Sequence, residues 1–350
     1  MKRTYLDHAA TAPILPEARE AMLAGLALDA NPSSPHAAGR AARRALENAR
    51  ERVKASLEWN GELVFTSGAS EALMLALTRT HAGRRAVSAV EHEAVTRHAT
   101  GARVLRVDAR GLVDPDALGD VSDTLVAVQQ VNNETGVLQP LGSIADAVRA
   151  GGGVLLADCA QGAGKIPLPD CDMAAISAHK FGGPPGIGAL LVRDFSLLAP
   201  TGGQERGYRG GTENVAGAMA MAAAMETGHA WMAEALRLRA KLEDAVIEAG
   251  GEIVAADSPR IATIGSVRIP GLGSAVQLIR LDGAGIAVSA GSACSSGSLK
   301  ASRVLTAMGM DEQAAAEVIR VSVGPDTTEA DIDAFLDVWT ALAQQVRASA

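Results

Sequence analysis

The most constraining feature of this 350-residue chain is a series of short apolar runs separated by helical patterns. The helical patterns fall near 68–80, 93–100 and 141–150. Strands that alternate with helices usually form a parallel sheet covered by helices. We therefore predict an α/β protein built on a largely parallel sheet. The expected strands are 62–66, 86–90, 103–107, 124–131, 153–157, 173–177 and 187–192.

This rhythm changes after residue 213, which indicates a second folding unit. A long Ala/Met/Leu helical pattern covers about 214–250, and mixed strand and helix patterns follow it. A chain of this length is also too long for one small core. We expect a large domain at 12–232 and a small α+β domain at 1–11 and 233–350. Further expected helices are 16–28, 39–57, 274–281, 298–308 and 328–347, and further strands are 265–269, 286–290 and 318–323.

Composition excludes several classes of function. The net charge of −8 argues against nucleic acid as the main partner. No run approaches the roughly 18 apolar residues of a membrane span, and the N-terminus lacks a signal-peptide core. Three cysteines do not make a disulfide framework. We therefore expect a cytoplasmic protein with no membrane partner and no metal site.

Asp158 and Lys180 each follow an apolar run, so both side chains are expected at the carboxyl edge of the sheet. Pyridoxal phosphate (PLP) requires an amine for covalent attachment and a carboxylate for its pyridine nitrogen. A carboxylate after a buried strand also needs a cationic partner. The alternative role for Asp158 is to cap the turn that follows it. The pair makes a PLP site plausible without defining the reaction.

Three polar motifs follow other expected strands, and each allows two interpretations. Segment 66–71 could bind a phosphate at a helix N-terminus or form an ordinary N-cap. His92 could stack on a ring and transfer protons, or it could be structural. Asn132 and Asn133 fit a turn, but an amide there could also hold a cofactor hydroxyl or a substrate carboxylate.

Two further features point to ligand binding or subunit contact. The glycine-rich loop 202–214 could be a lid, a subunit contact or a plain surface loop, and its Thr212 resembles a helix N-cap that could bind phosphate. Arg320 is a charge within a strand pattern. It could face solvent, or it could face a cleft and clamp a carboxylate with two hydrogen bonds.

Cys294 lies among small residues in segment 289–298, whereas structural cysteines usually have large apolar neighbours. A helix expected to begin near Ser298 would favour its thiolate form. We therefore interpret Cys294 as a reactive thiol. Cys159 and Cys171 are interpreted as small buried fillers.

Together these motifs resemble the cysteine desulfurases of the NifS/IscS type, within the class V aminotransferase group. The resemblance covers essentially the whole chain, in the family's order. It implies PLP-dependent transferase fold type I, with a mostly parallel seven-stranded sheet in the large domain. The matching stretches are 5–11, 31–36, 66–71, 91–92, 132–134, Asp158 with Gln161, 179–180, 209–214 and 291–294.

The resemblance also implies a role for each site residue. Lys180 would attach the cofactor, Asp158 would bind its pyridine nitrogen, and His92 would stack on its ring and transfer protons. Gln161 would bind the phenolic oxygen, and Asn133 and Arg320 would take the substrate carboxylate. The phosphate would be held by Ala69, Ser70, Ser177 and His179, with Thr212 from the other subunit of a homodimer.

The implied reaction removes sulfur from L-cysteine, leaving L-alanine and a persulfide on Cys294. The sulfur must then pass to an acceptor protein, so the cysteine needs a segment that can move. An iron–sulfur scaffold or a thiolation carrier would be such an acceptor. The chain ends at Ala350, without the longer tail that helps some relatives dock a scaffold, so the acceptor stays open.

This sequence departs from the family's pattern at two further positions, and three other functions compete with cysteine desulfurase. Ser70 stands where many relatives carry threonine, and Pro185 stands where relatives often carry a basic residue. An aminotransferase would not need Cys294, whereas a selenocysteine lyase would differ mainly in its choice of chalcogen. A catalytically silent scaffold would be expected to lack Lys180, Asp158 or Cys294, and all three are present.

Overall fold

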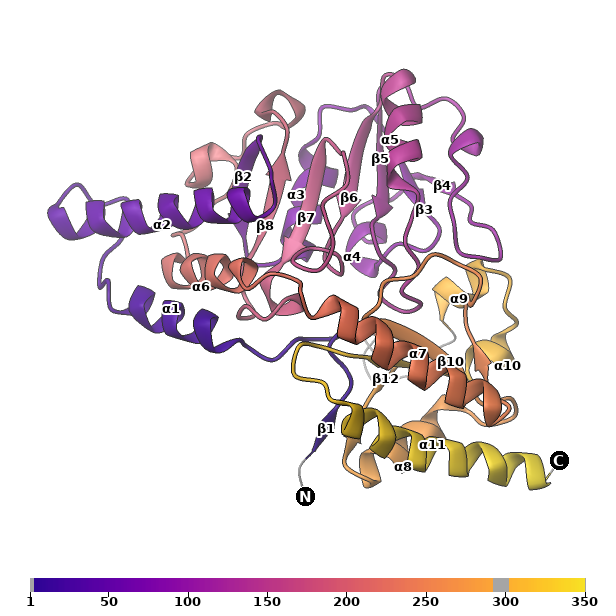
Figure 1. The fold of residues 1–350 in the computed structure, drawn as a ribbon. Coiled ribbons are helices and arrows are strands. Elements are labelled where there is room, and N and C mark those ends of the chain that lie inside the picture. Colours follow the sequence, from indigo (N-terminus) through magenta and orange to yellow (C-terminus); the bar gives the residue numbers. More distant parts are fainter. Residues whose placement is uncertain (1–2, 292–301, 350) are drawn as a thin grey trace.

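The computed structural model describes residues 3–291 and 302–349, and a seven-stranded sheet forms its centre (Figure 1). The strand order is β2-β8-β7-β6-β5-β3-β4, and only β8 runs antiparallel to its neighbours. The predicted α/β class with a mostly parallel sheet is therefore confirmed. The strands are β2 (Glu62–Thr66), β3 (Arg84–Ser88), β4 (Arg103–Leu105), β5 (Thr124–Gln129), β6 (Val154–Asp158), β7 (Met173–Ser177) and β8 (Gly188–Val192).

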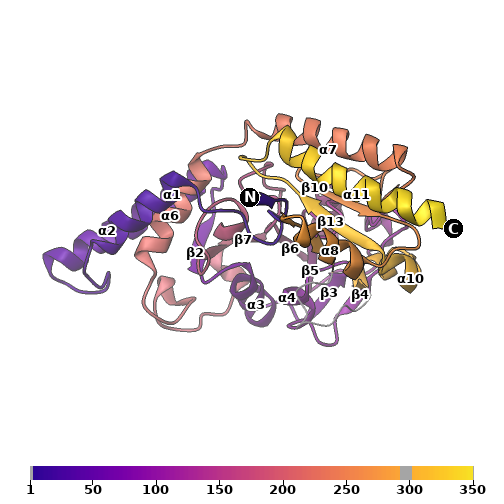
Figure 2. The same ribbon diagram turned by 90° about the horizontal axis from the view of Figure 1, so that it is seen from below.

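Helices bury both faces of this sheet, which explains why its strands are continuous apolar runs. On β5, Val126 packs into one hydrophobic core and its neighbour Leu125 packs into the other. Helices α1, α2 and α6 lie side by side in both views and share the first core with α5 (Figures 1 and 2). Helices α3 and α4 cover the other face. Their bounds are α1 (Pro16–Leu26), α2 (Ala37–Ser56), α3 (Ala69–Arg79), α4 (Glu93–Thr96), α5 (Leu141–Ala150) and α6 (Val215–Glu226).

A second, antiparallel sheet has the order β12-β13-β10-β9 and its own core, which contains Phe335 and Trp339. Its strands are β9 (Glu252–Ile253), β10 (Ile264–Arg268), β12 (Ser289–Ala290) and β13 (Val318–Ser322). The accompanying helices are α7 (Met232–Glu248), α8 (Ser274–Gly283), α9 (Arg303–Ala307), α10 (Glu312–Ala315) and α11 (Glu329–Ser349). Across the described ranges, no helix is both long and apolar enough to cross a membrane.

The N-terminal segment connects the two sheets. Strand β1 (Thr4–Tyr5) pairs with β11 (Ile286–Ala287), and the amide of Ala9 donates to the Ser322 hydroxyl at 2.9 Å. Three residues later, the amide of Ala12 donates to the carbonyl of His179 in the large sheet's loop at 2.7 Å. These contacts place residues 3–9 beside the small sheet. The domain boundaries at 12 and 232 themselves stay a proposal.

The structure corrects several expected elements. The pattern at 214–250 forms two helices, because the chain turns between Glu226 and Met232 with Gly228 at a φ of +76°. The strand expected at 286–290 is two short strands, β11 and β12, which pair with different partners. Helix α4 is shorter than expected, and the described part of the helix expected at 298–308 begins at Arg303. Strand β9 was not expected, because two residues carry no periodic pattern.

The glycine-rich loop 202–214 is anchored by a buried ion pair. Arg50 of α2 binds both carboxylate oxygens of Glu205, at 2.8 and 3.0 Å, and both side chains are 1% exposed. Glu205 also accepts the amide of Phe65 at 2.8 Å, although its own φ is +48°. The ion pair therefore holds this loop against β2 in a backbone conformation that is uncommon for residues other than glycine.

Replacing Glu205 with alanine is expected to destabilise the protein by about 3–5 kcal/mol, because it leaves the Arg50 charge buried without its main partner. Urea unfolding followed by circular dichroism measures the loss. The control is Glu51→Ala, since the Lys54–Glu51 contact of 3.4 Å involves a glutamate whose side chain is 63% exposed. Removing that pair should cost less than about 1 kcal/mol. Equal losses for the two variants would contradict the prediction.

Candidate active site

A cavity of about 580 Å³ opens at the carboxyl ends of the central parallel strands, where ligands usually bind in such sheets. The ends of β5, β6 and β7 contribute residues, as do the start of α3, the N-terminal turn and the small sheet. Most of the predicted site residues therefore meet at one place. Its lining includes Asp7, Ala9, Ser67, Ala69, Ser70, His92, Gln129, Asn133, Asp158, Gln161, Ser177, His179, Lys180, Pro185, Gly291 and Arg320.

Lys180 ends a short 3₁₀ turn (Ala178–Lys180) directly after β7. Its Nζ donates to the carbonyls of Ala9 and Ala10, at 2.7 and 2.9 Å. Gln161 donates to the same Ala9 carbonyl at 2.8 Å, and its Oε1 is buried without a hydrogen-bond partner among the described residues. The N-terminal turn thus orients the lysine and the glutamine together.

Asp158 is the last residue of β6 and is 8% exposed. One carboxylate oxygen accepts the amide of Ala160 at 3.0 Å, so the side chain does cap the following turn. Burial raises the pKa of Asp158, and this effect opposes the lowering by His92 and Lys180. A cationic ligand group beside this carboxylate would therefore be stabilised by it.

His92 is the N-cap of α4 and lines the cavity from the end of β3. Its Nδ1 accepts the amide of Ala94 at 3.1 Å, which places the ring proton of the neutral imidazole on Nε2. Burial lowers the pKa of His92, while the Asp158 charge raises it. The structure thus favours a neutral His92 ring. Its Nδ1 is used in the N-cap hydrogen bond to Ala94, and its Nε2 takes no part in that cap.

The α3 N-terminus supplies a cradle of small residues. Its N-cap, Gly68, has a φ of +157°, and Ser67, Ala69 and Ser70 line the cavity. Ser177 and His179 line it from the β7 side. The positive end of this 11-residue helix suits an anionic group. Thr212 is exposed and is not part of this lining.

Arg320 faces the cavity rather than solvent, and its side chain is 6% exposed. It forms a 2.8 Å ion pair with Asp7 and donates to the carbonyl of Asn133 at 2.8 Å. Ser289 donates to the other Asp7 oxygen at 2.8 Å. Sequence reasoning missed Asp7 as a site residue. The one signal for it was its place in the matching stretch 5–11.

Cys294, the predicted nucleophile, lies outside the described residues. The residues that precede the segment 292–301 line the cavity: they are Ser289, Ala290 and Gly291. The other two cysteines are buried, as expected for fillers. Burial raises the pKa of the Cys159 thiol well above its usual value and that of Cys171 to about 12. Neither thiol is therefore suited to act as a nucleophile.

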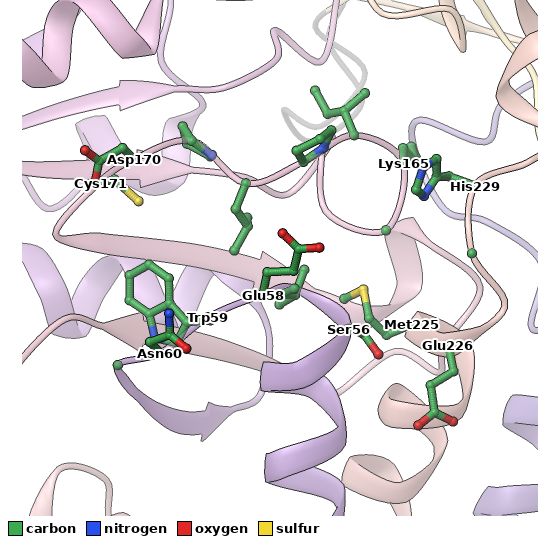
Figure 3. A pocket seen from close by; sticks show the side chains of 18 of the residues that line it. Ser56, Glu58, Trp59, Asn60, Lys165, Asp170, Cys171, Met225, Glu226 and His229 are labelled. Carbon is green, nitrogen blue, oxygen red and sulfur yellow. The ribbon is translucent and has the colours of Figure 1, made fainter.

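A second cavity, of about 700 Å³, lies between the α2–β2 loop and residues 164–171 (Figure 3). Asp170 and Cys171 lie on one side of it, and Lys165 and His229 lie on the other. Lys165 is 6% exposed, and burial together with the Lys180 charge lowers its pKa to about 7. Of the predicted site residues that the structure describes, none lines this cavity.

Comparison with known proteins agrees with this site. The chain belongs to the class-V aminotransferase family, whose model (Aminotransferase class-V) matches residues 4–335. Within that family it groups with the cysteine desulfurases, which confirms the resemblance inferred from its motifs. A cysteine desulfurase of Gluconacetobacter diazotrophicus is 37% identical, over 99% of this chain and 95% of that protein.

Two further relatives support the same grouping. The IscS-like cysteine desulfurase of Mycobacterium tuberculosis is 36% identical, over 99% of this chain and 98% of that protein. The crystal structure of a NifS-like protein from Rickettsia africae superposes with a TM-score of 0.89 at 30% identity, covering 97% of this chain and 99% of that one. The similarity therefore extends over the whole fold.

Proposed function

We infer that this chain is a PLP-dependent cysteine desulfurase. The observation that carries the inference is that Asp158 and Gln161, at and just after the end of β6, and Lys180, after β7, line one cavity with the α3 N-terminus. The amine can attach the cofactor and the helix end can hold its phosphate. The family and its named relatives agree with this assignment.

The residues present fit PLP. A protonated pyridine nitrogen is the cation that the buried Asp158 carboxylate would stabilise. Gln161 has an unused amide hydrogen for the phenolic oxygen, and Ala69, Ser70, Ser177 and His179 would hold the phosphate. When bound, PLP withdraws electrons from the substrate's Cα. His92 would stack on the ring, and the proton on its Nε2 is the one that it would donate.

Arg320 and Asn133 would bind the carboxylate of L-cysteine. Arg320 is already held by Asp7 and by the Asn133 carbonyl, so its guanidinium is oriented before the substrate arrives. A bidentate arginine–carboxylate contact would fix the amino acid relative to Lys180.

The net reaction transfers one sulfur atom. L-Cysteine and the Cys294 thiol give L-alanine and a Cys294 persulfide: the substrate C–S bond breaks, an S–S bond forms, and protons balance without an external oxidant. A reductant or an acceptor protein then removes the outer sulfur.

We infer a cytoplasmic homodimer in which Thr212 reaches the partner's phosphate site, because Thr212 is exposed and lies outside the cavity of its own chain. An iron–sulfur scaffold or a thiolation carrier would accept the sulfur.

The direct test is to incubate the purified PLP-loaded protein with L-cysteine and excess dithiothreitol and to measure alanine and sulfide. We expect both products in equal amounts. L-Selenocysteine assayed in parallel distinguishes a desulfurase from a lyase specific for selenium. 3-Mercaptopyruvate and no sulfide, with a 2-oxo acid as co-substrate, would indicate an aminotransferase and overturn the proposal.

A further inference from the structure

Glu134 contacts both ends of the segment that carries Cys294. It lies in the turn after β5, next to Asn133, and its side chain contacts Ser302 and Gly291. Its Oε2 accepts the Ser302 hydroxyl at 2.5 Å. The same oxygen packs on Gly291 so closely that a Cβ there would lie 2.2 Å from it. Gly291 and Ser302 are the residues immediately before and after segment 292–301.

The Glu134 backbone is itself held in place. Its amide donates to Asn132 Oδ1 at 2.9 Å, and its carbonyl accepts the Ser266 hydroxyl of β10 at 2.6 Å. Asn132 is 1% exposed and also donates to the Val90 carbonyl at 3.2 Å. The carboxylate therefore projects from a rigid turn that joins the large sheet to the small one.

The Ser302 end is tied down by several contacts. Ser302 is the N-cap of α9, and its hydroxyl accepts the amide of Leu305 at 3.1 Å while donating to Glu134. The next residue, Arg303, donates to the Glu91 carbonyl at 3.1 Å and to Thr96 at 3.2 Å. The end of the cysteine segment is thus docked on the loop that carries His92.

These contacts limit where the nucleophile can go. Cys294 is three residues after Gly291, so its Cα can lie at most about 10 Å from that glycine. Gly291 itself lines the cavity, so the chain enters the segment that carries Cys294 next to the proposed substrate site. Losing either contact would remove a fixed anchor from one end of that segment, and the rate of a reaction between two groups depends on how well they are held relative to each other.

We propose that Glu134 is a positioning residue for sulfur transfer: its carboxylate joins Gly291 to Ser302 and so sets the reach of Cys294, without binding the cofactor. This inference rests on the proposed desulfurase function. It also explains why residue 291 is glycine, because any side chain there would displace the carboxylate from Ser302.

The kinetic test compares four variants of the PLP-loaded enzyme. Glu134→Ala, Ser302→Ala and Gly291→Ala should each lower kcat for alanine formation about 10- to 100-fold, because small misplacements of reacting groups have effects of this size. KM for cysteine and the visible cofactor absorption should stay near the parent values. Glu134→Gln, whose amide oxygen can still accept from Ser302, should keep kcat within about threefold.

The matched control is Asp311→Ala, which removes the N-cap of α10 in the same part of the fold but does not touch the segment. It should behave as the parent. A parent-like kcat in Glu134→Ala would overturn the proposal. So would loss of cofactor, or a KM that rises in proportion to the loss of kcat, since either would indicate a binding or purely structural role.

A proteolysis measurement, which does not depend on enzyme activity, tests the Glu134 contact separately from the proposed function. Limited trypsin cleavage after Lys300, followed by mass spectrometry, should be several-fold faster in Glu134→Ala and Ser302→Ala than in the parent and Asp311→Ala. If the parent makes no alanine, the proposed function fails, whereas the cleavage rates still test the Glu134 contact. Unchanged cleavage in Glu134→Ala would overturn the contact even in an active enzyme.

Discussion

Lys180→Ala is expected to abolish covalent cofactor attachment and to lower alanine formation at least about a thousandfold, as removal of a covalent catalyst commonly does. The side chain lies at the cavity and is oriented by the Ala9 and Ala10 carbonyls. The visible absorption of the lysine-bound cofactor should disappear. Borohydride reduction followed by peptide mapping, which locates the modified lysine, should find no label in the variant.

Lys180→Arg is the matched control. Arginine keeps the positive charge and can still donate to both carbonyls, but it cannot attach the cofactor. It should therefore be as inactive as Lys180→Ala while its thermal midpoint stays nearer the parent's. The rival amine is Lys165, which is buried nearby and has its pKa lowered to about 7, so much of it is neutral at pH 7. A borohydride label on Lys165 of the unmodified protein would contradict the assignment.

Cys294→Ala is expected to lower sulfide and persulfide formation at least about a thousandfold while leaving the cofactor's absorption intact. The reason is chemical: burial raises the pKa of both other thiols, so neither provides a thiolate near neutral pH. Intact-mass spectrometry after a single turnover should find one added sulfur on the parent and none on the variant.

The paired control for this prediction is Cys171→Ala, which removes a buried thiol that lines the second cavity. That variant should form persulfide at the parent rate, although it should be somewhat less stable because a small cavity is left in the core. Sulfide production at the parent rate in Cys294→Ala would show that a different group accepts the sulfur.

Much of the large sheet could be predicted because local patterning and tertiary burial agree there. Each of its strands is a short apolar run, since helices cover both faces, and the polar residues after β3, β5, β6 and β7 meet at one edge. The pattern at 214–250 could not be divided correctly, because the apolar composition continues across both helices and only the turn near Gly228 separates them.

Other features depend on contacts between residues that are far apart in the chain. Asp7 and Arg320 meet only because the N-terminal segment lies beside β13, and Arg50 meets Glu205 only because the glycine-rich loop folds back onto α2. Glu134 reads in the sequence as part of a turn. Its contacts with Gly291 and Ser302 exist only because the turn after β5 lies beside the end of β12.

The sequence by itself determined the fold class, the family and the chemistry, because these depend on residue types at local spacings: an amine and a carboxylate after strands, and a thiol among small residues. Only the tertiary structure decided which pKa values shift, which ion pairs are buried and what contacts Arg320 and the residues on either side of the cysteine segment. Burial and pairing are properties of three-dimensional neighbours, which local patterns do not encode.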